Sequence, residues 1–161
     1  MKKLIIVRHS KSSWKDSSLL DFDRPLNKRG NKDGKKMSKL LKKYISSVDL
    51  LISSSSERTR LTSSYFQKEI KFINSIFSKK LYHASSQEII KTLNEIESGV
   101  NSVLLIGHNP GLTDFINKKT DINIFNLPTT GVVIIKFPIK SWLEFDYKSG
   151  KVELIKFPKE I

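Results

Sequence analysis

The chain contains no cysteine among its 161 residues. Disulfide bonds, thiolate zinc sites and a cysteine nucleophile are therefore excluded, and a reducing compartment is the default expectation. Long apolar runs are also missing. The apolar stretch near the start spans only Leu4–Val7, whereas a secretory signal core needs about 7–15 residues and a membrane span about 18. We therefore expect a soluble, cytoplasmic protein with no membrane partner.

Acidic residues are scarce beside basic ones. Aspartate plus glutamate number 16 and lysine plus arginine 29, which gives a formal net charge of +13. Such a charge raises the question of nucleic-acid binding. The excess is mostly lysine spread along the chain, however, without the clustered arginine or interleaved aromatic residues of nucleic-acid sites. We expect no nucleic-acid partner. Nucleotide bias in the encoding genome would explain the lysines, and their field would still attract an anionic substrate.

The order of predicted elements indicates one α/β domain covering residues 1–161. Apolar β-branched runs predict strands and apolar residues at helical spacing predict helices. In chain order these are a strand at 3–8, a helix at 30–45, a strand at 49–53, a helix at 57–70, a strand at 76–81, a helix at 86–97, a strand at 102–107, a short helix ending near 118 and a strand at 131–137. The segments 142–147 and 152–157, around a turn at 148–151, predict a C-terminal β-hairpin. This order predicts a three-layer α/β/α sandwich, with a mostly parallel sheet and helices on both faces.

Two of the three histidines stand at the ends of predicted strands. His9, preceded by Arg8, follows the first strand, and His108 follows the strand at 102–107. The carboxyl ends of parallel strands meet at one edge of a sheet, where ligands bind. Imidazole is a competent nucleophile toward phosphorus, and the arginine fork matches phosphate oxygens. We therefore predict a phosphoryl-binding pocket at this edge. Taken alone, an Arg-His pair is usually a surface feature, and His108 equally suits a structural position.

Arg58 extends this pattern. It follows the serine run 53–56 at the predicted start of a helix, and helix amino ends attract anions through free N–H groups. A solvated arginine beside Arg60 is the alternative interpretation.

Together these pieces resemble the signature of the histidine phosphatase superfamily, and more narrowly its SixA-type branch of small phosphohistidine phosphatases. The resemblance spans residues 3 to about 135 in the family's order. It rests on Leu4–Trp14, Asp23–Gly30, Ser54–Thr62, Leu81–Ser85 and Ile106–Gly111. It implies a phosphoglycerate mutase-like fold and an enzyme that removes phosphoryl groups.

The resemblance also implies the role of each residue. His9 would attack phosphorus and become a transient phosphohistidine, while Arg8, Arg58 and His108 would hold the equatorial oxygens. Two adjacent arginines disfavour protonation of the nucleophile, which should stay neutral. Neither a metal nor another cofactor is implied.

The sequence departs from the family pattern at two positions. Ser10 replaces the usual glycine after the nucleophile, and it is small enough to allow backbone approach to phosphate. His83 stands where mutase-like relatives carry a glutamate as general acid. Without a carboxylate an alkoxide is hard to protonate, whereas imidazole is a far less basic leaving group. This difference favours phosphohistidine as substrate, with His83 either an acid or part of the pocket wall.

We expect the mouth of the pocket to form from two segments. One is the loop with Ser12, Trp14 and Lys15, and the other is the turn with Thr130 and Gly131. A chain this short has no large insertion to form a lid, which suits a phosphorylated protein better than an enclosed metabolite. We therefore expect a monomer acting on phosphohistidine in proteins. A small phosphomonoester remains the alternative substrate, and a non-catalytic phosphate-binding module the alternative class.

Other chemical motifs are incomplete. Asp21-Phe22-Asp23 imitates a two-aspartate phosphatase motif, but it does not follow an apolar strand. The histidines show neither HxH nor HExxH spacing, so we predict no metal site. A Walker loop is absent.

Overall fold

The computed structural model describes all 161 residues and contains one six-stranded sheet. The strands are β1 (Lys2–Arg8), β2 (Ser47–Ser54), β3 (Lys71–Ser78), β4 (Ser102–Gly107), β5 (Val132–Phe137) and β6 (Lys151–Lys156). Their order across the sheet is β3-β2-β4-β1-β5-β6. The first four run parallel, β5 is antiparallel to β1, and β6 is antiparallel to β5.

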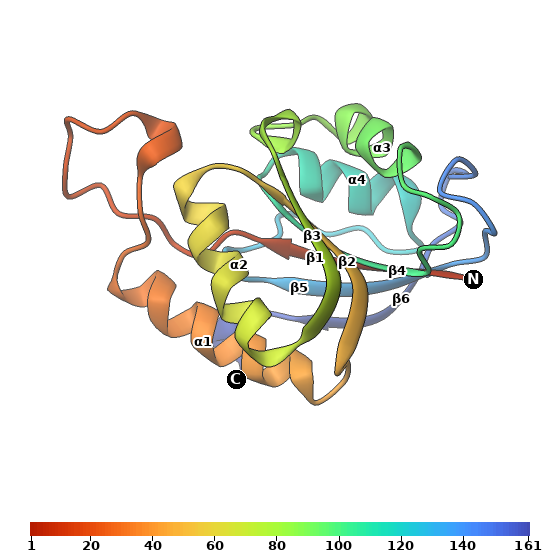
Figure 1. Cartoon of the computed structure of the whole chain (residues 1–161), viewed down its shortest axis with the longest axis horizontal. Helices are drawn as coiled ribbons and strands as arrows, with labels where there is room; N and C mark the ends of the chain where they lie inside the picture. Colours follow the sequence, from red (N-terminus) through yellow and green to blue (C-terminus); the bar gives the residue numbers. More distant parts are fainter.

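Two helices cover each face of the sheet (Figure 1). On one side lie α1 (Lys28–Lys42) and α2 (Glu57–Glu69), and on the other α3 (Ser86–Asn94) and α4 (Gly111–Lys119). Side chains cap two of the helix starts, because Asn27 accepts from the Gly30 N–H and Ser85 from the Glu88 N–H. Three short 3-10 turns complete the structure: η1 (Asp21–Asp23), η2 (Lys79–Leu81) and η3 (Pro158–Glu160).

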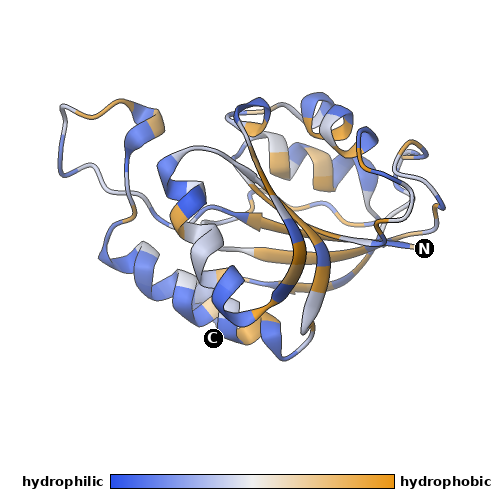
Figure 2. Ribbon diagram, in the orientation of Figure 1, coloured by the Kyte–Doolittle hydropathy of each residue, from blue (hydrophilic) through white to orange (hydrophobic).

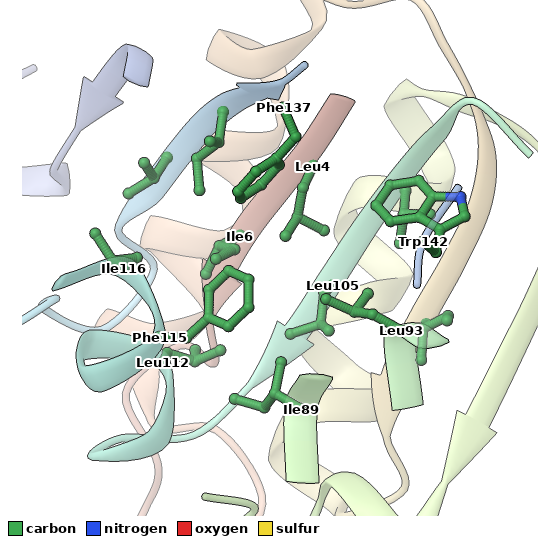
Figure 3. Close-up of a cluster of buried hydrophobic side chains, with 14 of the residues drawn as sticks. Leu4, Ile6, Ile89, Leu93, Leu105, Leu112, Phe115, Ile116, Phe137 and Trp142 are labelled. Atoms are coloured by element: carbon green, nitrogen blue, oxygen red, sulfur yellow. The ribbon is translucent and has the colours of Figure 1, made fainter. Parts of the chain in front are cut away.

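Alternation along β1 divides the core into two layers. Ile5 and Val7 pack with residues of α1 and α2, whereas Leu4 and Ile6 pack with residues of α3 and α4 (Figure 3). Successive strand side chains point to opposite faces, so a continuous apolar run fits a strand that is covered on both. Figure 2 shows the same division, with hydrophobic strands between helices whose outer faces are hydrophilic. The predicted three-layer sandwich is confirmed.

The third strand lies earlier than the sequence indicates. It was expected at 76–81 but spans Lys71–Ser78, and Leu81 belongs to η2. This strand forms an edge of the sheet and is largely exposed. Polar residues such as Asn74 and Ser75 therefore replace the continuous apolar run of an interior strand.

The C-terminal hairpin has different partners from those predicted. Segment 142–147 is not a strand, and β6 pairs with β5 instead, with Val132 opposite Lys156. The apolar character of the segment has another cause. Trp142 is fully buried in the core cluster to which α3 and α4 also contribute, and its Nε1 donates a 2.7 Å hydrogen bond to the Val100 carbonyl.

Residues 10–27 form a long excursion from the end of β1, coloured red to orange at the left of Figure 1. Its two arms are joined by backbone hydrogen bonds, from Ser13 N to the Pro25 carbonyl at 2.8 Å and from Asn27 N to the Lys11 carbonyl at 3.0 Å. The excursion is therefore pinned at its base. In the whole structure, no helix combines the length and the apolar character that crossing a bilayer requires.

Candidate active site

A pocket of about 270 Å³ opens where β1, β2 and β4 end and the excursion begins. It is lined by Arg8, His9, Lys11, Ser12, Trp14, Asp21, Arg24, Arg58, His83, His108, Asn109 and Thr129. A larger hollow of about 530 Å³ lies beside β3, but neither histidine nor arginine lines it. The smaller pocket gathers all three histidines, so it is the candidate active site.

His9 presents one free ring nitrogen. Its Nδ1 lies 2.8 Å from the carbonyl oxygen of Ser10. A carbonyl only accepts, so Nδ1 carries the hydrogen and Nε2 keeps its lone pair. The backbone N–H of His9 donates to the Gly107 carbonyl at 3.1 Å, which continues the pairing with β4 past the end of β1. The tautomer that a nucleophile requires is thus set by local backbone.

The His9 ring stays neutral at physiological pH. The pKa of His9 is lowered to about 3, and burial of the ring is the largest cause. The charges of Arg58 and Arg8 lower the pKa further, whereas the hydrogen bond to Ser10 opposes the shift. A neutral imidazole can attack an electrophile, whereas an imidazolium cannot.

His108 lies beside His9, with ring centroids 5.2 Å apart. Its Nε2 is 2.8 Å from Ser54 Oγ, and its Nδ1 is 3.5 Å from an Nη2 of Arg58. Burial first, then the neighbouring His9 and Arg58, lower the pKa of His108. A guanidinium only donates, so this long contact makes Nδ1 the acceptor and leaves the hydrogen on Nε2, which donates to Ser54 Oγ. Because a hydroxyl can also donate, Ser54 would fit the other neutral tautomer as well. An acceptor facing Nδ1 would take its hydrogen while Ser54 donates to Nε2.

The two arginines hold donors that no protein group uses. The Nε atoms of Arg8 and Arg58 are buried and have no hydrogen-bond partner. Burial first, and then the nearby Arg58, lower the pKa of Arg8. Buried unsatisfied donors are rare and costly, and two guanidinium groups repel each other unless an anion lies between them. Because Arg8 and Arg58 both line the pocket and their charges repel each other, a bound oxyanion would stabilise the arrangement.

Asp21 also lines the pocket, although the sequence predicts no role for it. Its Oδ2 lies 3.0 Å from Nη2 of Arg58 and 3.0 Å from Nε2 of His83, and it also accepts from the Tyr82 hydroxyl. Its Oδ1 accepts from Arg24 at 3.0 Å. Partial burial opposes ionisation, but the hydrogen bonds from Tyr82, His83 and Arg58 lower the pKa of Asp21 below its ordinary value.

The predicted substrate-binding residues separate into two groups. Ser12 and His83 line the pocket. Ser10 and Thr130 are fully buried behind His9, where their hydroxyls share a 2.8 Å hydrogen bond. Gly131 is also behind the wall, and its carbonyl accepts from the Arg8 N–H at 3.2 Å.

Ser10, Thr130 and Gly131, which the sequence predicts to bind substrate, thus lie outside the pocket lining and behind it. The cause is the antiparallel neighbour β5, since the turn before this strand is hydrogen-bonded to the end of β1. Lys15 is exposed and does not line the pocket.

Trp14 forms part of the mouth, as expected from the sequence. Its ring lies 3.5 Å from the guanidinium carbon of Arg24, within the range of a cation–π contact. Arg24 is in turn held by Asp21, so the indole is positioned although it is 73% exposed. No group of three histidine, aspartate or glutamate side chains has a geometry that could hold a metal ion.

The comparisons with known proteins agree with this geometry. A family model described as the histidine phosphatase superfamily (branch 1) matches residues 4–108. The chain belongs to this superfamily. An uncharacterised chloroplastic protein of Arabidopsis thaliana is 28% identical over 159 residues, which cover 92% of this chain and 72% of that protein.

Solved structures of SixA proteins share the fold. A candidate phosphohistidine phosphatase SixA from Agrobacterium tumefaciens matches with a TM-score of 0.83 and 22% identity over 98% of both chains. The protein histidine phosphatase SixA in complex with tungstate matches with a TM-score of 0.79 and 18% identity, again over 98% of both chains. The predicted phosphoglycerate mutase-like, SixA-type fold is confirmed, and the superfamily supports phosphatase activity.

Proposed function

We propose that the protein is a metal-independent phosphatase that works through a phosphohistidine on His9. One observation carries the proposal: a neutral histidine with an unprotonated Nε2 lines the same pocket as the two cationic side chains of Arg8 and Arg58. A phosphoryl group supplies both the electrophile that the imidazole needs and the oxygens that the arginines need.

The reaction has two steps. The lone pair of His9 Nε2 forms a bond to phosphorus, and the bond to the leaving group breaks with its electron pair going to that group. Arg8, Arg58 and His108 stabilise the charge on the phosphoryl oxygens. Water then attacks the phosphorus, the P–N bond breaks, its electron pair returns to Nε2, and phosphate is released.

Phosphohistidine in proteins is the substrate we favour. The pocket has an open mouth bordered by the exposed Trp14 and by Lys11, so a side chain on a protein surface can enter it. The likeness in fold to SixA proteins supports the same choice. The Asp21 carboxylate favours a second candidate substrate, a small phosphomonoester, because a carboxyl group that lines the pocket can protonate a leaving group.

Trapping with radiolabelled phosphoramidate tests the mechanism. We expect an acid-labile, base-stable label on His9 and on no other residue. His9→Ala should lose both the label and turnover by about 10⁴-fold or more, while Lys15→Ala, outside the pocket, should keep both. Rapid turnover without label on His9 would reject the mechanism.

A substrate panel separates the remaining possibilities. Faster hydrolysis of phosphohistidine peptides than of sugar or nucleotide phosphates would support the favoured substrate, and the reverse order the phosphomonoester. A non-catalytic binding module would show no turnover, and its His9→Ala variant would retain affinity for phosphate.

A further inference from the structure

Asp21 brings a carboxylate to the pocket from outside the expected segment. The resemblance in sequence implies a glutamate acid at the position that His83 occupies in this chain, so the sequence indicates a site without a carboxyl acid. In the structure Asp21, from η1 of the excursion, lies 3.0 Å from the Nε2 of His83. The loop after β1 therefore delivers the group that the segment after β3 lacks.

The side chain of Asp21 lies between the buried cation and the open mouth. Arg58 beneath it is 3% exposed, whereas the Asp21 carboxylate is 41% exposed. The pocket lining contains both residues together with His9. A phosphoryl group bound to the arginines would direct its leaving atom outward, because the nucleophile approaches from the opposite, buried side. Asp21 is thus on the path of the departing group.

We propose that Asp21 is the general acid that protonates the leaving group, and the general base that activates water in the second step. This inference rests on the proposed phosphatase function. It assigns a catalytic residue to the same pocket, and it extends the substrate class to phosphomonoesters with basic, alkoxide-type leaving groups.

The proton balance follows from the two steps. As His9 Nε2 bonds to phosphorus and the P–O bond breaks, the departing oxygen takes the electron pair of that bond and the proton of the Asp21 carboxyl. Asp21 is left as a carboxylate. It then accepts a proton from water as the water oxygen attacks phosphorus, the P–N bond breaks toward Nε2, and the carboxyl group is restored.

The required proton is taken up with the substrate. Without substrate the carboxylate is ionised, because Arg24, Arg58, Tyr82 and His83 all face it. A phosphoryl dianion bound to Arg58 would offset that cation and add like charge beside Asp21, and both effects favour the protonated carboxyl. The neighbouring His108 is neutral and does not counter this.

Leaving-group dependence tests the assignment. We expect Asp21→Asn to lower kcat/KM for alkyl phosphates by about 10²–10⁴-fold, the usual contribution of a general acid. For p-nitrophenyl phosphate, whose phenolate needs no proton, the loss should be less than about tenfold. The same contrast is expected between alkyl phosphates and phosphoramidate.

Two further variants serve as comparisons. Asp23 lies in the same turn but outside the pocket lining, so Asp23→Asn should leave kcat/KM unchanged for both alkyl and aryl phosphates. His83→Gln should lower kcat/KM for alkyl and aryl phosphates by the same factor. An equal loss on both classes in Asp21→Asn would show that Asp21 only positions Arg58 and overturn the inference, as would a leaving-group-dependent loss confined to His83→Gln.

Failure of the proposed function is distinguishable from failure of this inference. If the parent protein forms no labelled His9, the phosphatase mechanism itself is wrong. If His9 becomes labelled from p-nitrophenyl phosphate in both the parent protein and Asp21→Asn, then His9 is the nucleophile. The ratio of kcat/KM for alkyl phosphates to that for aryl phosphates then decides the role of Asp21.

Discussion

The orientation of His108 depends on one hydroxyl at the end of β2. Ser54 is fully buried, and its Oγ lies 2.8 Å from Nε2 of the imidazole. The other nitrogen faces Arg58 at 3.5 Å, a long contact that holds the ring weakly. Ser54 is therefore a positioning residue, since it acts on the phosphoryl group only through His108.

Ser54→Ala tests this positioning. A lost neutral hydrogen bond costs about 1 kcal/mol, which corresponds to about a fivefold lower kcat if it acts in the transition state. We expect this fivefold loss in kcat. The free energy of unfolding should fall by no more than about 1 kcal/mol. Ser53→Ala is the matched control, because this neighbour is equally buried but bonds only to the Ser54 carbonyl. Equal kinetics for the two variants would contradict the assignment.

The residues at strand ends were predictable, and the residue on the excursion was not. His9 and His108 follow apolar runs that are typical of buried parallel strands. Because the carboxyl ends of such strands meet at one edge of the sheet, the sequence predicts that the two histidines lie together. Asp21 lies in an irregular segment with no periodicity. Its position is fixed by contacts with Arg58 and His83, 37 and 62 residues away in sequence. No local pattern encodes such contacts.

At the scale of elements, the base of the excursion packs directly on α1. A Cβ built on Gly30 would lie 2.1 Å from the carbonyl oxygen of Lys11. Because Lys11 also lines the pocket, this close approach couples the start of a helix to the site. The stretch Asp23–Gly30, which carries part of the family resemblance, thus contributes to the site by packing at Gly30 and not by a reacting group there.

Gly30→Ala should destabilise the protein by about 1–3 kcal/mol, the usual cost of forcing extra volume into a packed contact. KM should rise as Lys11 shifts. Gly99→Ala is the control, because no atom lies within 4 Å of its added Cβ, and surface substitutions usually stay within about 0.5 kcal/mol. Denaturant unfolding of the three proteins checks this prediction, and a Gly30→Ala midpoint equal to that of Gly99→Ala would refute it.

The two misplaced elements share a physical cause. Periodicity reports burial, and burial does not identify the partner. The edge strand β3 is exposed, and the predicted strand begins later in the sequence than the observed one. Segment 142–147 is apolar because Trp142 is buried, but it is not a strand. The interior strand β4, covered on both faces, matches its predicted bounds.

At the scale of the whole molecule, the neutral buried histidines make stability depend on pH. The pKa of His9 is lowered to about 3, and that of His108 is lowered in the same direction. In the unfolded chain both titrate near their ordinary value of about 6.5. Below that pH the unfolded state binds more protons than the folded state, so acid favours unfolding.

The free energy of unfolding should therefore fall between about pH 6 and pH 4, by up to about 1.4 kcal/mol per pH unit for each of the two histidines. Below pH 4 the ionised Asp21 contributes with the same sign, because its pKa is also lowered. Urea titrations at several pH values measure the slope. His9→Asn should reduce it, and a slope unchanged by that substitution would mean that His9 is protonated in the folded protein.

The global architecture followed from the sequence because its signals are repeated. Strand–helix alternation recurs through the parallel half, and each interior strand carries the same apolar run, so errors at single elements leave the sandwich intact. The net charge of +13 adds no information about the fold, since it is spread over exposed lysines. It bears on the rate at which anions arrive.

The contrast between the two tryptophans has a practical consequence. Trp14 lines the mouth and is 73% exposed, whereas Trp142 is sealed in the core at 0%. Only the first indole can change its surroundings when an oxyanion occupies the pocket, so intrinsic fluorescence divides into a responsive and a constant component. Ligand titrations can therefore be followed optically on the unmodified chain, with Trp14→Phe as the blank.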